Sequence, residues 1–206
     1  MIIHKPLNEI FSTYSNIAVI RELRYTRNGF TGREIAKRAE LSAPAVLSAL
    51  SHLESLKIVK RQIGGRDHLF TLRVNNYFVK KILFPIMEIE SQFFELIKSQ
   101  LKKCLSKNSV SVILFGSVAR KEETIESDFD ICIVYSGSEN KKTLENRMDS
   151  CQTQLSNQYG ITPAPFYISL KEFRSRAKLK KSPINDIVKE GIVLCGKSIR
   201  GLISEK

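Results

Sequence analysis

A short apolar run that ends in Gly-Ser, followed eleven residues later by two aspartates, constrains this chain more than any other feature. Residues 110–115 read VSVILF, which has the length and the β-branched content of a buried strand. At the strand end Gly116 permits a sharp turn, and the amides that follow would point outward at a helix start, where they attract phosphate. The hydroxyl of Ser117 can donate one more hydrogen bond to a phosphate oxygen. The pattern therefore predicts a strand, a tight turn and an anion site.

The two aspartates predict a metal site beside that turn. In a strand over residues 128–135 the side chains alternate, so Asp128 and Asp130 would share one face about 7 Å apart. Two carboxylates next to phosphate-binding amides suit Mg²⁺, or Mn²⁺. Such a cation neutralises a nucleoside triphosphate and aligns it for attack.

The segments GSVAR and SDFD resemble the signature of the minimal nucleotidyltransferases of the DNA polymerase beta superfamily, known as MNT domains. The likeness runs over about residues 80–196 and implies a mixed sheet with helices. It assigns a nucleoside triphosphate to the first segment, and catalysis and the divalent metal to the second. The residues so implied are Gly116, Ser117 and Arg120 for the nucleotide, and Asp128 and Asp130 for catalysis and the metal.

The chain departs from that family at two places. Lys121 stands where a glycine usually follows the Ala-Arg pair. The family's third carboxylate lies on a later strand, here predicted over residues 165–170, but residues 161–171 contain no Asp or Glu. That carboxylate usually serves the attacking hydroxyl as a general base, a role worth about 10²- to 10⁴-fold in rate. Three interpretations stay open: a weak enzyme, a substitute acid such as Glu172, or a domain that only binds.

The amino-terminal third follows the order helix, turn, helix, hairpin. Thr31 and Glu34 form a capping box at the first of these helices, and Ser42 caps the second, with Pro44 in its first turn. Apolar residues of the second helix recur at helical spacing and predict one buried face. These residues are Val46, Leu47, Leu50, Leu53 and Leu56.

Residues 58–62 and 68–73 read as two strands joined through Gly64 and Gly65, which suit the tight turn of a hairpin wing. Residues 15–74 thus resemble a winged helix-turn-helix, the DNA-reading module of many prokaryotic transcription regulators. That resemblance places residues 42–56 in the major groove and the hairpin on the minor groove or the backbone. The residues predicted to contact DNA are Ser42, Ala43, Ala45, Ser48, His52, Lys60, Arg61 and Arg66.

The predicted recognition helix has no Arg, Lys, Asn or Gln, the side chains that most often read bases. Base discrimination should therefore be modest, and a winged helix that contacts protein or forms a dimer is the alternative. Charge favours a polyanionic partner, because the chain has 33 basic and 21 acidic residues and a net charge of +12.

The length of 206 residues suits two small domains in an α+β architecture. The expected domains are a winged helix-turn-helix over 1–75, a connecting amphipathic helix over 76–107 and an MNT-like domain over 108–206. The connecting helix is expected to pack on the sheet, and a homodimer seam is the second interpretation. Without a membrane-length apolar stretch or a signal-peptide core, and with four dispersed cysteines, the chain is expected to be cytoplasmic, without a membrane partner.

Three functional hypotheses follow. The first is a DNA-associated nucleotidyltransferase that moves a nucleoside monophosphate from a triphosphate to a hydroxyl on a protein or a small molecule. The second is a transcription regulator whose degenerate nucleotidyltransferase domain senses a nucleotide without turning it over. The third is a component of a toxin-antitoxin pair, which rests on family analogy alone.

Overall fold

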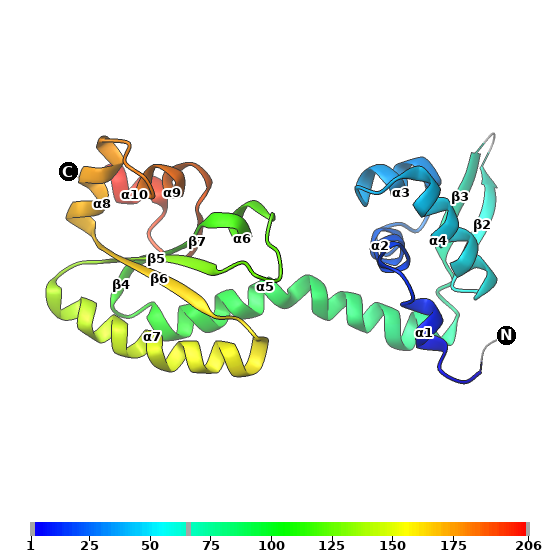
Figure 1. Ribbon diagram of the computed structural model, residues 1–206, viewed down its shortest axis with the longest axis horizontal. Helices are drawn as coiled ribbons and strands as arrows, with labels where there is room; N and C mark the ends of the chain where they lie inside the picture. The colour runs from blue at the N-terminus through cyan, green and yellow to red at the C-terminus, as the bar shows by residue number, and fades with distance from the viewer. Residues whose placement is uncertain (1–2, 65–66, 205–206) are drawn as a thin grey trace. The chain divides into compact units, whose positions relative to one another are not determined.

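The structure is a computed structural model that describes residues 3–64 and 67–204 (Figure 1). The chain divides into two compact units, Met1–Gln92 and Phe93–Lys206. The boundary falls inside the segment 76–107, which was expected to be a separate connecting helix. The residues of that segment therefore contribute to both units.

The first unit has the chain order and sheet topology of a winged helix-turn-helix, as predicted. Several helices and a three-stranded antiparallel sheet of order β1-β3-β2 enclose its core. A π-helical turn, η1, precedes the long helix α5, which begins afresh one residue before Pro85. Its elements are α1 (Pro6–Ile10), α2 (Tyr14–Leu23), β1 (Phe30–Thr31), α3 (Gly32–Arg38), α4 (Ala43–Ser55), β2 (Val59–Gly64), β3 (Asp67–Leu72), η1 (Val79–Leu83) and the start of α5 (Phe84–Leu105).

Local sequence signals set these helix starts. The hydroxyl of Thr31 accepts from the backbone N–H of Glu34, whose carboxylate accepts in return from the Thr31 N–H, so the capping box is confirmed. Ser42 caps α4 in the same way. One expectation was wrong: Leu47 was assigned to the buried face of α4, but it is 55% exposed. Spacing allowed either face, and neighbouring helices cover only the stripe that contains Val46 and Leu50.

The second unit is built on a four-stranded sheet of order β6-β5-β4-β7. The β5 and β6 pair is parallel and the other pairs are antiparallel, so the predicted mixed sheet is confirmed. The remaining elements are β4 (Ser109–Leu114), α6 (Gly116–Arg120), β5 (Phe129–Tyr135), α7 (Ser138–Tyr159), β6 (Pro163–Ser169), α8 (Leu170–Lys178), α9 (Ile184–Glu190), β7 (Ile192–Gly196) and α10 (Ile199–Ser204).

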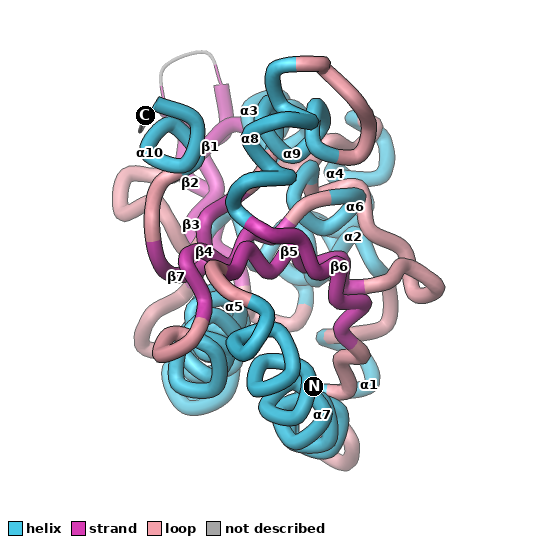
Figure 2. The backbone as a smooth tube through the Cα atoms, turned by 90° about the vertical axis from the view of Figure 1, so that its left-hand side faces the viewer, coloured by secondary structure: helices cyan, strands magenta, loops and turns pink. Residues whose placement is uncertain are grey.

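Helices cover both faces of this sheet (Figure 2). On one face the end of α5 and the helix α7 bury apolar side chains such as Leu101 and Met148 against the strands. On the other face α8, α9 and α10 contribute Phe173, Ile187 and Leu202. The strands are apolar on both faces for this reason. Polar residues are left to the strand ends, where the candidate site lies. In the part of the chain that the structure describes, no helix has the length and apolar character needed to cross a membrane.

Candidate functional site

The turn after β4 is packed tightly against β5. Gly116 opens α6 with φ of 75°, a left-handed conformation that glycine adopts without strain. The N–H of Phe115 donates to the carbonyl of Asp130 at 3.0 Å, which extends the pairing of the two strands up to the turn. A Cβ atom on Gly116 would stand 2.3 Å from Oδ2 of Asp130. Only glycine therefore fits beneath this carboxylate.

The two aspartates interact electrostatically. β5 begins at Phe129, so Asp128 lies one residue before the strand that was expected to contain it. Asp128 is exposed and Asp130 is half-buried. Burial raises the pKa of Asp130 above its ordinary value of 3.8, and the charge of Asp128 raises it further. A cation between the two carboxylates would offset this mutual repulsion.

The helix α6 ends in a conformation that explains one departure from the family pattern. Lys121 follows the last residue of α6 with φ of 60° and ψ of 35°. This left-handed position at a helix end favours glycine, because a Cβ there is crowded by the carbonyl that follows. The family's usual glycine would fit it without strain, whereas Lys121 adopts it at a small cost.

Arg120, which the resemblance implied as a nucleotide ligand, is held between two carboxylates. Its guanidinium lies 2.8 Å from Glu122 and 3.2 Å from Glu190. All three side chains are at least 40% exposed, so these ion pairs are weak and open to exchange. Sequence reasoning missed Glu190, which is seventy residues away along the chain.

The second departure from the family pattern, the missing third carboxylate, is also seen in the structure. β6 contains no acid, and the residue in register with Asp130 on this neighbouring parallel strand is Ala164. Glu172, the nearest acid in sequence, follows the opposite end of β6 and pairs with Arg176. Because that end is paired with Tyr135, Glu172 is separated from Asp130 by about 17 Å of strand and does not replace the missing carboxylate. Among residues 3–64 and 67–204, no three His, Cys, Asp or Glu side chains are grouped to hold a metal.

A cavity of about 460 Å³ opens beside Asp128. Its walls combine apolar side chains with the acidic loop before β5, and that loop carries Glu123 and Glu126. The lining residues are Phe93, Phe94 and Ile97 of α5, Val118 of α6, residues 123–129, and residues 160–162. The cavity offers room for a group that would react next to the carboxylate pair.

The residues predicted to contact DNA lie at or on α4 and on the wing. Ser42, Ala43 and Ser48 are exposed on α4, and Ala45 is half-buried. His52 faces α1, where its Nε2 lies 3.1 Å from the carbonyl oxygen of Glu9.

On the wing, Lys60 is half-buried and Arg61 is exposed. Arg61 also lies 3.3 Å from Glu54. Arg66, together with Gly65 of the predicted turn, lies outside the described residues.

Comparison with known proteins gave one family and several distant structures. Residues 97–194 match the nucleotidyltransferase domain family. The comparison with curated proteins found no match.

Three solved structures illustrate the distant likenesses. MepR, a transcription regulator of the Staphylococcus aureus multidrug efflux pump MepA, is 22% identical over 48% of this chain and 82% of its own, with a TM-score of 0.37. A toxin-antitoxin complex with AMP-PNP is 16% identical over 49% of this chain and 74% of its own, with a TM-score of 0.31. TrmBL2, an archaeal chromatin protein, is 19% identical over 89% of this chain and 72% of its own, with a TM-score of 0.29.

The family match covers the strand, the turn and the carboxylate pair described above, and it ends within β7. The amino-terminal unit has its own core and the strand order of a hairpin wing. The chain thus combines a unit with the topology of a winged helix-turn-helix with a region, residues 97–194, that matches the nucleotidyltransferase domain family.

Proposed function

We propose that this protein binds DNA through its winged helix and binds a nucleoside triphosphate with a divalent cation at the turn between β4 and β5. In this complex the oxygen of an acceptor hydroxyl attacks the α-phosphorus of the triphosphate, which transfers the nucleoside monophosphate to the acceptor and releases pyrophosphate. The contact between Gly116 and the carboxylate of Asp130 carries the proposal, because it brings an amide-lined turn and a carboxylate into one site.

The carboxylate pair suits a magnesium ion. Mg²⁺ is usually held by one or two carboxylates together with substrate phosphates and water, so Asp128 and Asp130 supply a sufficient protein share. The burial of Asp130 next to a second negative charge also favours a cation at this point. When bound, the metal would neutralise the triphosphate and align its phosphates.

The protein groups around that position have separate tasks in the proposal. The amides at the start of α6 and the hydroxyl of Ser117 would orient the phosphates. Arg120 would exchange its exposed carboxylate partners for a phosphate oxygen, since guanidinium binds both. The cavity beside Asp128 would hold the acceptor, with its apolar walls excluding water. Without an acid on β6, proton removal from the acceptor would fall to water, and transfer would be slow.

The winged helix would direct this activity to DNA. The exposed hydroxyls of Ser42 and Ser48 lie on the proposed recognition helix, and Lys60 and Arg61 lie on the wing. Cations on a wing neutralise phosphates, and this attraction is largely independent of sequence. A net charge of +12 for the whole chain agrees with a polyanionic partner.

A labelling experiment tests the transfer. The full chain is incubated with Mg²⁺, each of the four α-³²P-labelled ribonucleoside triphosphates in turn, and a cell extract as the source of acceptor. Label should pass to an acceptor with the natural chain and be absent with Asp128→Ala plus Asp130→Ala. Asp149→Ala plus Asp186→Ala removes the same charge from exposed positions and should label normally. Equal labelling by all three proteins would refute the proposal.

A second candidate function is a regulator that senses a nucleotide without turnover. The pairing of Ala164 with Asp130 favours it, because the strand position that usually supplies the base is empty of acid. A gel shift on the DNA upstream of the gene, at low salt with and without ATP and Mg²⁺, distinguishes it. A nucleotide-dependent shift without labelling of any acceptor would support sensing, and no DNA binding at low salt would exclude it. A toxin-antitoxin role remains a third hypothesis, which a small adjacent open reading frame would favour.

A further inference from the structure

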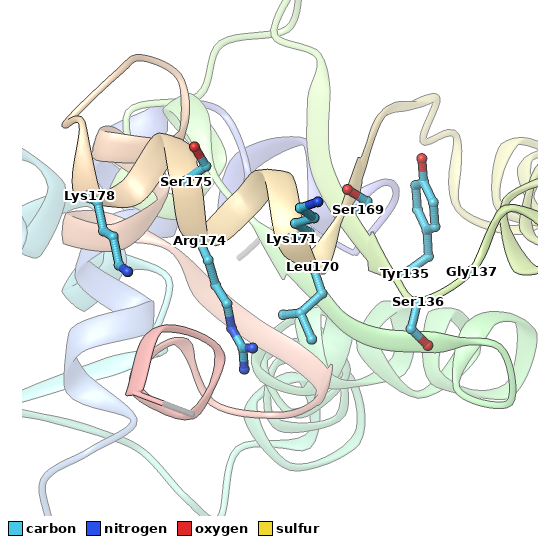
Figure 3. A pocket seen from close by; sticks show the side chains of 9 residues that line it. All are labelled: Tyr135, Ser136, Gly137, Ser169, Leu170, Lys171, Arg174, Ser175 and Lys178. Carbon is cyan, nitrogen blue, oxygen red and sulfur yellow. The ribbon is translucent and has the colours of Figure 1, made fainter. Parts of the chain in front are cut away.

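A second cavity, of about 550 Å³, lies at the other end of the sheet from Asp130 (Figure 3). Its lining residues are Tyr135, Ser136, Gly137, Ser169, Leu170, Lys171, Arg174, Ser175 and Lys178. Tyr135 and Ser169 are paired at the carboxyl ends of the parallel strands β5 and β6. Asp130 lies five residues earlier in β5, about 17 Å away along the strand. A ligand in this cavity would therefore not share the candidate nucleotide site.

The lining is strongly cationic. Lys171, Arg174 and Lys178 are three and four residues apart and follow one face of α8 (Figure 3). None of the lining residues is an acid, and four of them carry hydroxyl groups. The carboxylate of Glu139 lies against Gly137 at the edge of the cavity.

The three cations differ in how firmly they are held. Nε of Arg174 donates to the carbonyl of Leu202 at 2.7 Å, which fixes this guanidinium between α8 and α10. Within the described part of the chain, Lys171 and Lys178 form no ion pair, so their ammonium groups have no protein counter-charge there. Glu172, the one acid on α8, pairs with Arg176 instead.

Lys171 and Lys178 lie on one face of α8, and an anion between them would balance their charges. The cavity volume falls within the range of small-molecule sites, about 300 to 1,000 Å³. The carboxyl ends of adjacent parallel strands are also where ligands generally bind in open sheets with helices on both faces. Size, charge and position thus agree on a small anionic ligand.

We propose that this cavity is a binding site for a small phosphorylated molecule, whose phosphate contacts Lys171, Arg174 and Lys178. Cations and hydroxyl donors are the groups that bind phosphate oxygens. The half-buried side chain of Leu170, which lines the cavity, offers an apolar surface to the organic part of such a molecule. The inference does not depend on nucleotidyl transfer, because it uses none of the residues of that site.

Isothermal titration calorimetry on the full chain tests the site, with inorganic pyrophosphate and AMP as probes. EDTA and low salt keep divalent metal away from Asp128 and Asp130 and preserve charge attraction. The test variant is Lys171→Gln plus Lys178→Gln, which leaves the structural Arg174 in place. The matched control, Lys180→Gln plus Lys181→Gln, removes the same charge from exposed residues just beyond α8 that do not line the cavity.

Both probes should bind the natural chain, and the Lys171/Lys178 variant should weaken them at least about tenfold, the effect of losing charge-assisted hydrogen bonds. The control variant and Asp128→Ala plus Asp130→Ala should bind as the natural chain does. Equal weakening in the control would show general charge attraction and overturn the proposal. Loss in the aspartate variant would place the probes at the other site, which also overturns it. Binding of a twelve-residue oligothymidylate but of neither probe would replace the small ligand with a nucleic-acid strand.

Discussion

The carboxylate of Asp130 lies directly over the Cα atom of Gly116. A Cβ on Gly116 would stand 2.3 Å from Oδ2 and 3.2 Å from Cγ of Asp130, both closer than unstrained contacts allow. The turn proposed to hold phosphate and the carboxylate proposed to hold a cation therefore form one packed unit. A change at Gly116 or at Asp130 should therefore affect both the proposed phosphate binding and the proposed cation binding.

Gly116→Ala should lower stability and weaken cation binding. The new methyl group must displace the Asp130 carboxylate, and alanine at φ of 75° adds a left-handed strain of about 1–2 kcal/mol. Gly160→Ala is a matched control, because Gly160 has φ of 67° and open space around its Cβ position. Thermal unfolding should show a larger loss for Gly116→Ala, and Mn²⁺ titration should show weakened binding for that variant alone. Natural Mn²⁺ affinity in Gly116→Ala would mean that the turn does not position the carboxylate.

Asp130→Asn should stabilise the metal-free protein at neutral pH. Because burial and Asp128 raise the pKa of Asp130, ionisation costs the folded state more than the unfolded chain. The natural protein carries this cost above the raised pKa and loses it as pH falls toward the ordinary value of 3.8. The stability advantage of the variant should therefore shrink over that range in thermal unfolding with EDTA. Asp128→Asn removes only the neighbouring charge, which is the smaller cause of the raised pKa of Asp130. It should therefore stabilise the protein less than Asp130→Asn does. A larger stabilisation by Asp128→Asn would contradict burial as the main cause of the raised pKa.

Local chemistry made much of this fold predictable. The capping box of Thr31 and Glu34 depends on residues three apart, a spacing that can be read directly from the sequence. Residues 97–194, which contain the Gly-Ser and Asp-x-Asp pattern, match the nucleotidyltransferase domain family, as the resemblance predicted.

Tertiary relationships limited the prediction of the site. The pairing of Ala164 with Asp130 depends on the parallel register of β5 and β6, which the intervening helix α7 sets and no local pattern encodes. The ion pair of Arg120 with Glu190 joins α6 to α9 across the fold. Periodicity alone likewise could not tell that Leu47 is exposed, because burial depends on which elements pack around α4.

Ala164→Asp should increase transfer. This change puts a carboxylate in register with Asp130 on β6, the strand that lacks an acid. A general base contributes about 10²- to 10⁴-fold, so even imperfect geometry should raise the labelling rate at least about tenfold. Ala164→Asn matches the size without the charge and should not raise it. Equal rates for the natural chain and both variants would favour the nucleotide sensor over a slow enzyme.

Glu190→Gln should strengthen triphosphate binding. The change removes one of the two carboxylates that hold Arg120, which leaves its guanidinium more available to a phosphate oxygen. Exposed ion pairs are weak, so the gain measured by calorimetry should be about two- to fivefold. Arg120→Ala in the Glu190→Gln background should cancel it. A gain that survives the loss of Arg120 would assign the effect to general charge.

Replacing the cations of the wing should weaken DNA binding and reduce its dependence on salt. Lys60 and Arg61 lie on β2, and each phosphate contact contributes about 0.9 to the slope of log affinity against log salt. Lys60→Gln plus Arg61→Gln should therefore lower the slope by about 2 in gel shifts at several salt concentrations. Lys80→Gln plus Lys81→Gln removes two exposed cations of η1 from the same unit and should leave the slope nearly unchanged. If both variants lower the slope equally, the wing does not contact the DNA backbone, and the winged helix is better explained as a surface for protein contacts.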